Sequence, residues 1–268
     1  MAKYKKKRAR ELQHDRFRDT TMSVFDRLGD RLEGRGRALL YGLIGLIVAA
    51  LVIFQLVRWT NKKSDEARQA LGRAITISRA QVTTTPPPGN TDPTFATDKE
   101  RAQRAIEEFQ KVAAKYGDPY KSESQYFIAA NRLVVDRQKG ISELTELQNS
   151  SVGEVAALSK FALGQAYESD GKLDDAARLY TELAKLNSKT VTADTANLRL
   201  AKVYEKQGKK KEAADLLFNI VDASRKAKGS DNQPLPQTSA AREAADALQK
   251  LDPDRYGQLP PETPLLAG

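Results

Sequence analysis

A spacing of small and aromatic residues that occurs twice limits the possible folds of this chain more than any other feature. Residues 163–180 read LGQAYESDGKLDDAARLY, with small and aromatic residues at fixed intervals: Gly164, Tyr167, Gly171, Ala176 and Tyr180. The pattern returns 37 residues later as Ala201, Tyr204, Gly208, Ala213 and Leu217. Small residues let two helices cross closely, aromatic rings fill the space beside them, and glycine forms the turn. We therefore expect two consecutive helical hairpins here.

At these positions the sequence resembles the tetratricopeptide repeat (TPR) family, whose helix-turn-helix unit recurs about every 34 residues. It departs from the family where Lys160 and Asn197 replace a bulky aromatic residue and Ser188 replaces the closing proline. Earlier units are more degenerate, because no good second-helix alanine follows Gly140. The resemblance implies an all-α solenoid of helical hairpins.

Apolar residues repeat at steps of three and four over residues 64–251, which predicts a helical domain. The insertion at residues 83–96 interrupts it, since the prolines of TTTPPPGNTDP exclude both helix and strand. Residues 252–268 are expected to form a flexible tail. The expected helices begin at Ser64, at Thr97 or Asp98, at Tyr120, at Ile141 and at Thr238, in addition to the two hairpins.

Residues 38–57, ALLYGLIGLIVAALVIFQLV, contain no charged residue. Twenty helical residues span about 30 Å, the thickness of the hydrocarbon core of a bilayer. The segment is longer than the apolar part of a cleaved signal peptide and has no small-residue cleavage site after it. We therefore expect a single transmembrane helix. Residues 1–37 carry 12 Lys and Arg, which predicts a cytoplasmic N-terminus and a C-terminal domain outside, in the periplasm of a Gram-negative cell.

Small residues share one face of the expected membrane helix: Ala38, Gly42, Gly45 and Ala49. Such a face lets a second membrane helix approach, either that of a partner or that of a second copy of this chain. Glycine and alanine are also common in membrane helices without any partner, so both interpretations stay open.

The basic arm at residues 1–37 has three interpretations. It is a solvated topology signal, a segment that contacts anionic headgroups or nucleic acid, or, over Met22 to Leu32, a short helix on the inner leaflet. The topology signal is the favoured one, and nucleic acid is not an expected partner. The net charge of +9 lies mostly in this arm.

The residues that catalysis or metal binding would need are missing or dispersed. There is no cysteine, and the single histidine, His14, lies in the basic arm. No glycine-rich phosphate-binding loop occurs, and the carboxylate pair Asp174 and Asp175 suits the start of a helix. We expect no enzymatic activity, no cofactor and no metal.

The repeat register places a further set of residues on the concave face of the solenoid. A groove there would bind an extended peptide or a partner helix; the alternative is that its phenylalanines are buried between units. The expected groove residues are Phe127, Asn131, Phe161, Gln165, Leu198 and Lys202.

The layout of a short cytoplasmic arm, one membrane helix and an exported repeat domain resembles the ancillary subunit of the bacterial Sec translocon. That resemblance implies a non-enzymatic adaptor in the inner membrane that links the translocon to periplasmic chaperones. The partners it implies are translocon subunits, chaperones or unfolded polypeptides. The alternative is a structural scaffold for envelope assembly or cell division, because a fold does not determine a function.

Overall fold

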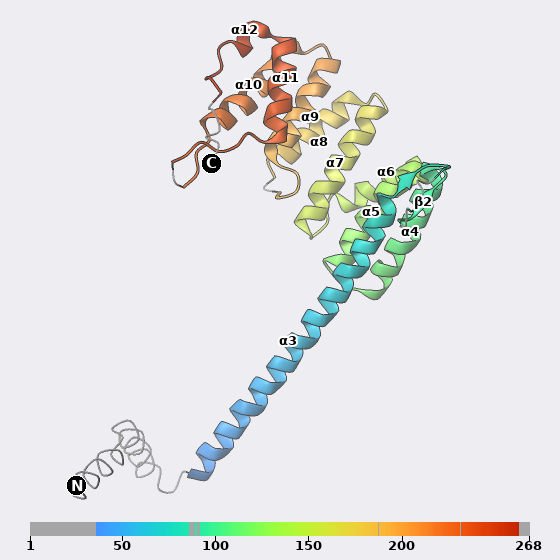
Figure 1. The fold of residues 1–268 in the computed structure, drawn as a ribbon, viewed down its shortest axis with the longest axis vertical. Coiled ribbons are helices and arrows are strands. Elements are labelled where there is room, and N and C mark those ends of the chain that lie inside the picture. The colour runs from blue at the N-terminus through green and yellow to red at the C-terminus, as the bar shows by residue number, and fades with distance from the viewer. Residues whose placement is uncertain (1–35, 86–88, 90–91, 187, 231, 263–268) are drawn as a thin grey trace, which may run out of the picture. The chain divides into compact units, whose positions relative to one another are not determined.

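The computed structural model describes residues 36–85, 89, 92–186, 188–230 and 232–262, and within 36–61 only some of the side chains (Figure 1). The chain divides into two units between Asp65 and Glu66. Within the described residues the second unit is built from helices and one two-stranded sheet. The helices after α3 are α4 (Asp98–Lys115), α5 (Tyr120–Val135), α6 (Arg137–Leu147), α7 (Gly153–Ser169), α8 (Leu173–Ala184), α9 (Ala193–Lys206), α10 (Lys210–Lys226), α11 (Ser239–Leu251) and α12 (Pro253–Tyr256).

Helix α3 runs from Gly36 to Ser78, so Ser64 lies inside a helix and does not begin one. The expected start was wrong because residues 58–63, RWTNKK, contain neither proline nor glycine to end the preceding turns. The C-terminal part of α3 buries Leu71 and Ala74 against Ala105 and Phe109 of α4. Among the described residues, no helix is both long and apolar enough to cross a membrane.

The proline-rich connection between α3 and α4 is closed at its ends by strands β1 (Gln81–Val82) and β2 (Thr94–Phe95), which pair in parallel. Helix α4 then begins where the sequence predicts it. The hydroxyl of Thr97 accepts a hydrogen bond from the Glu100 amide at 3.1 Å, and the Glu100 carboxylate accepts one from the Ala96 amide at 3.1 Å. These bonds satisfy amides that a helix start leaves unpaired.

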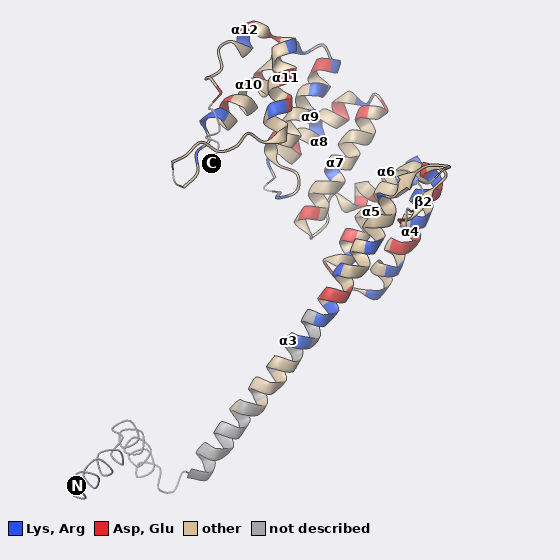
Figure 2. Ribbon diagram, in the orientation of Figure 1, with Lys and Arg blue, Asp and Glu red and all other residues tan. Residues whose placement is uncertain are grey.

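Charged residues of both signs alternate along the exposed side of α4 (Figure 2). Arg104 contacts Glu107 and Glu108, each at 2.9 Å, and Lys111 contacts Glu108 at 2.7 Å. Pairs at these helical spacings each contribute only a few tenths of a kcal/mol. They mark this side of α4 as solvated.

Helices α5 and α6 are joined by the single residue Asp136, whose carboxylate accepts a hydrogen bond from the Lys139 amide at 3.1 Å. Helix α6 therefore begins at Arg137, four residues before the expected Ile141. Gly140 lies where the two helices touch, since a Cβ added to it would be 2.7 Å from the Leu133 amide nitrogen. It supplies the small second-helix residue that the sequence pattern seemed to lack.

Helices α7 to α10 form two consecutive hairpins, and α11 packs against α10 at the end of the array. The expected flexible tail is wrong for residues 253–262. Leu259 is 9% exposed in the same apolar cluster as α10 and α11. The Arg225 side chain, which is 5% exposed, donates to the Pro260 carbonyl oxygen and pairs with Glu262 at 3.1 Å. Residues 1–35 and 263–268, which include most of the basic arm, lie outside the described residues.

Candidate protein-binding repeat region

The two hairpins end their first helices in the same way. Gly171 has φ +71° and Gly208 has φ +78°, a backbone conformation that residues with a Cβ adopt only with strain. The next amide in each turn reaches back to an aromatic residue: Lys172 N–H donates to the Tyr167 carbonyl at 2.9 Å, and Lys209 N–H to the Tyr204 carbonyl at 2.9 Å. Both turns are therefore Schellman caps, 37 residues apart in sequence.

Small-against-bulky contacts join the two helices of each hairpin. In the first, Tyr180 is fully buried and its ring lies on Gly164. Ala176 is also fully buried. In the second hairpin the corresponding residues Ala201, Ala213 and Leu217 are also buried. Tyr204 is partly buried.

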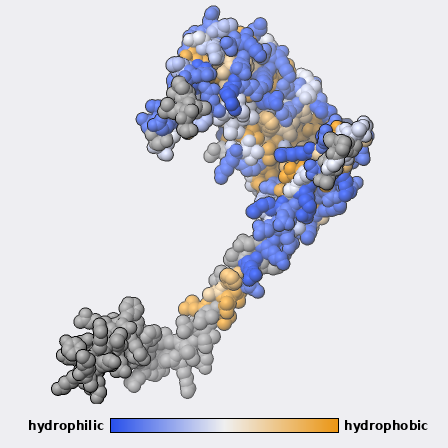
Figure 3. All heavy atoms as spheres, viewed as in Figure 1, coloured by the Kyte–Doolittle hydropathy of each residue, from blue (hydrophilic) through white to orange (hydrophobic). Residues whose placement is uncertain are grey.

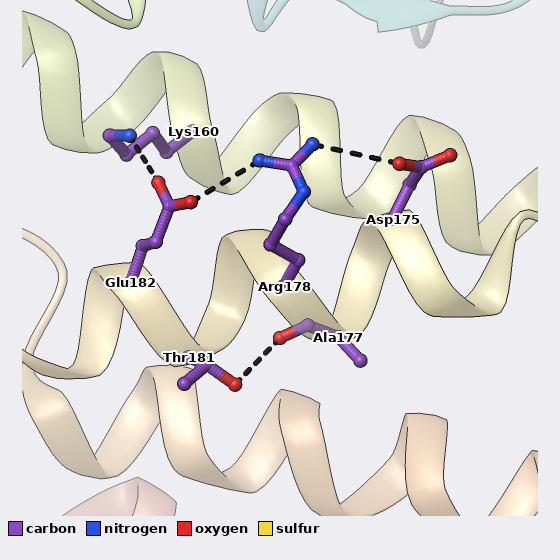
Figure 4. A network of polar contacts seen from close by, with 6 residues as sticks. All are labelled: Lys160, Asp175, Ala177, Arg178, Thr181 and Glu182. Carbon is purple, nitrogen blue, oxygen red and sulfur yellow. Dashed lines mark hydrogen bonds and ion pairs between the residues drawn. The ribbon is translucent and has the colours of Figure 1, made fainter.

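Lys160 occupies the position where the repeat pattern places a bulky aromatic residue, and it joins a polar network instead (Figure 4). Its ammonium contacts the Glu182 carboxylate at 2.6 Å, and Glu182 also contacts Arg178 at 3.2 Å. The hydrogen bond from Lys160 lowers the pKa of Glu182. The side chain of Lys160 is 15% exposed, so its aliphatic part fills space that an aromatic ring would otherwise fill.

Phe127 and Asn131, two of the expected groove residues, make contacts with the helices before α5. The ring of Phe127 stacks on Phe109 of α4, with centroids 4.8 Å apart and planes 8° from parallel. The side-chain amide of Asn131 donates to the Phe127 carbonyl at 2.8 Å, and its oxygen accepts from the Ser78 hydroxyl at 3.2 Å. Both residues therefore join α5 to the helices before it. Both are partly exposed, and their place in a groove stays a prediction.

The remaining groove residues divide between internal packing and a partly exposed surface. Leu198 is 5% exposed among residues of α10 and α11, so it belongs to the core. Lys202 pairs with Glu243 of α11, which lowers the pKa of Glu243. Phe161 and Gln165 are partly exposed on α7, although the Phe161 ring also lies 6.0 Å from that of Tyr180. The structure does not bring the six residues together into one groove.

The small residues of the expected membrane helix fall within α3, but their side chains lie outside those that the structure describes: Ala38, Gly42, Gly45 and Ala49. The structure therefore does not test their packing.

Sequence reasoning missed a cleft between α4, α5 and α6 and the connection to α7, with a volume of about 600 Å³. Its wall contains the ion pair between Arg132 and Glu143. The sequence offers no periodic signal for this cleft, because its residues come from four segments. In the described part of the chain, no group of three or more His, Asp or Glu side chains is arranged to hold a metal ion.

Comparison with protein families identifies the two hairpins. Residues 161–190 and residues 195–221 each match a tetratricopeptide repeat family. Neither curated proteins nor solved structures match the chain. The helical hairpins and the Schellman caps described above agree with the match to tetratricopeptide repeats. Repeats of this kind typically serve as non-enzymatic surfaces for protein binding. We conclude that residues 161–190 and 195–221, which lie within α7 to α10, form tetratricopeptide repeats.

Proposed function

We propose that this protein is a membrane-tethered adaptor of the inner membrane that links the Sec translocon to periplasmic chaperones through its repeat domain. The observation that carries the proposal is the pair of consecutive tetratricopeptide repeats at residues 161–190 and 195–221. Repeat arrays present extended surfaces to other proteins. The Sec link rests on the order of a basic arm, an apolar segment and a repeat domain, at residues 1–37, 38–57 and 64–251.

The tether is supported by the side chains of α3 that the structure describes before Arg58. Large apolar residues between 46 and 54 are 52–71% exposed and colour as hydrophobic in Figure 3. At about 100° per residue they point to several sides of the helix, not to one stripe. A helix that is apolar all round is suited to lipid. These residues are Leu46, Val48, Leu51, Val52 and Phe54.

Crosslinking of the full-length chain in native membranes tests the proposal. A photoreactive residue at Gln165 samples the partly exposed surface of α7, and one at Gly45 samples the apolar segment. Crosslinks from position 165 to chaperones and from position 45 to channel subunits are expected. Crosslinks only to division or envelope-assembly proteins would support the scaffold alternative, and a chain that washes off membranes with carbonate would refute the tether.

A further inference from the structure

The cleft between α4, α5 and α6 has the size of a binding site and a polar lining. Its volume of about 600 Å³ lies within the range of known ligand sites. Two of its lining residues are apolar and the others carry amide, hydroxyl or charged groups. The lining consists of Gln110, Ser122, Gln125, Ile128, Arg132, Glu143, Glu146, Leu147, Ser150 and Ser151.

The wall of this cleft is fixed by contacts between α5 and α6. The Arg132 and Glu143 side chains form an ion pair and are 15% and 28% exposed. Gly140 allows the backbones of the two helices to touch, and Asp136 caps the start of α6. A site whose walls are already in place loses little conformational entropy when a ligand binds.

Several polar groups of the cleft have no partner within the described part of the chain. The side chains of Gln110, Gln125 and Glu146 are exposed and form no hydrogen bond there. Oε2 of Glu143 also has no partner. Two carboxylates and one guanidinium line the cleft, so it carries a small negative charge. The side-chain amides both donate and accept, as the peptide groups of an extended chain do.

We propose that this cleft binds an extended polypeptide segment of a partner protein that carries a lysine or arginine. The peptide groups of the segment bond to Gln110 and Gln125, and its basic side chain lies against Glu146, next to Glu143. This inference rests on the proposed adaptor function and names the site and the chemistry of the segment. The proposed binding site is separate from the partly exposed surface of α7 that includes Phe161 and Gln165.

The test uses the full-length protein in lipid nanodiscs and a fluorescent decapeptide in which serine and valine alternate around one central lysine. Binding is followed by fluorescence anisotropy, with a second peptide that carries glutamine in place of the lysine. The lysine peptide should bind more tightly, and added salt should reduce the difference. Glu146→Lys should weaken its binding about tenfold, because the substitution removes an attraction and adds a repulsion.

Two further variants make the result specific. Glu146→Gln should weaken binding less than Glu146→Lys. Glu107→Lys changes the same charge on an exposed part of α4 outside the cleft and should leave the affinity within about twofold. Circular dichroism checks that each variant is folded.

Two results would overturn the proposal that the cleft binds the peptide. One is an affinity for the lysine peptide that Glu146→Lys leaves unchanged. The other is no binding of this peptide to the wild-type protein at a peptide concentration of about 1 mM. Neither result would contradict the adaptor function, which the crosslinks from position 165 test separately. Loss of those crosslinks with peptide binding retained would instead refute the adaptor function and leave the cleft as a peptide site.

Discussion

The ring of Tyr180 lies on the backbone of Gly164, so that a Cβ added to Gly164 would be 2.6 Å from Cε1 of Tyr180. The ring has no room to move away, because Tyr180 is fully buried and its hydroxyl lies 3.3 Å from the Glu168 carboxylate. Burial, together with the nearby Glu168, raises the pKa of the Tyr180 phenol. This contact explains why the first repeat has glycine where a helix interior would favour alanine.

Gly164→Ala should therefore destabilise the protein despite the higher helix propensity of alanine. Overpacking costs about 1–3 kcal/mol, and the gain in propensity is about 1 kcal/mol, so we expect a net loss of roughly 1 kcal/mol. Gly164→Leu should cost more than about 3 kcal/mol. Urea denaturation followed by circular dichroism measures both variants.

Gly72→Ala is the matched control, because Gly72 lies inside α3 and a Cβ there would meet no atom within 4 Å. It should raise the free energy of unfolding by up to about 1 kcal/mol. A Gly164→Leu variant as stable as the wild type would contradict the close helix crossing. In a Tyr180→Leu background, Gly164→Ala should lower the free energy of unfolding by less than it does in the wild type, since the smaller side chain leaves room for the added methyl group.

The turn glycines act through the backbone and not through crowding. A Cβ at Gly171 or at Gly208 would meet nothing within 4 Å, yet both have positive φ. Gly171→Ala and Gly208→Ala should each cost about 1 kcal/mol, because alanine is strained in this conformation. Asparagine, which tolerates it better, should cost less at either position. Equal stability of the alanine and glycine forms in thermal denaturation would contradict the Schellman caps.

Glu154, in the first turn of α7, forms hydrogen bonds with the connection between α8 and α9. Its carboxylate accepts hydrogen bonds from the Lys189 amide at 2.9 Å, from the Ser188 hydroxyl at 2.8 Å and from the Thr190 amide at 3.2 Å. These bonds, that of the Lys189 amide first, lower the pKa of Glu154 from 4.5 to about 2. The folded state therefore favours the ionised carboxylate.

A lowered carboxyl pKa stabilises the folded state above the unfolded pKa of 4.5, and this contribution is lost as the pH falls toward about 2. Glu154→Gln should therefore cost roughly 1 kcal/mol at pH 7, a small value because the site is near solvent. The difference from wild type should shrink below pH 4.5. Ser188→Ala removes one of the donors and should have a smaller effect. A difference that stays constant from pH 7 to pH 3 in urea denaturation would contradict this role.

The sequence predicts the helices that depend on a local pattern of residues. It does not predict features that depend on contacts between distant segments. Apolar periodicity and Thr97 place α4 correctly, and the repeated spacing places the hairpins of α7 to α10. The side on which a first-helix residue lies depends on how neighbouring units pack. For this reason Leu198, which is expected in a groove, lies in the core, and Phe127 is partly buried against Phe109 of α4. The cleft beside Arg132 combines residues of several segments, which no linear pattern reveals.

One apolar residue and one arginine attach the C-terminal segment, residues 253–262, to the end of the array. Leu259 is buried with α10 and α11, and Arg225 lies 5.6 Å from the centre of the Tyr256 ring and contacts Pro260. Leu259→Ala should cost about 2 kcal/mol, since it leaves a cavity in a packed cluster, and Arg225→Ala should release residues 257–262.

Leu235→Ala is the control for this segment, because Leu235 is 49% exposed and its truncation should change stability by less than about 0.5 kcal/mol. Limited proteolysis should spare residues 253–262 in the wild-type chain, whereas the Leu259→Ala and Arg225→Ala variants should be cleaved within 253–262. Equal cleavage of that stretch in the wild type and both variants would mean that the segment is detached in solution. In that case the apolar surface of α10 and α11 that Leu259 covers would be open to water, so wild-type protein should also bind a hydrophobic dye as strongly as the Leu259→Ala variant does.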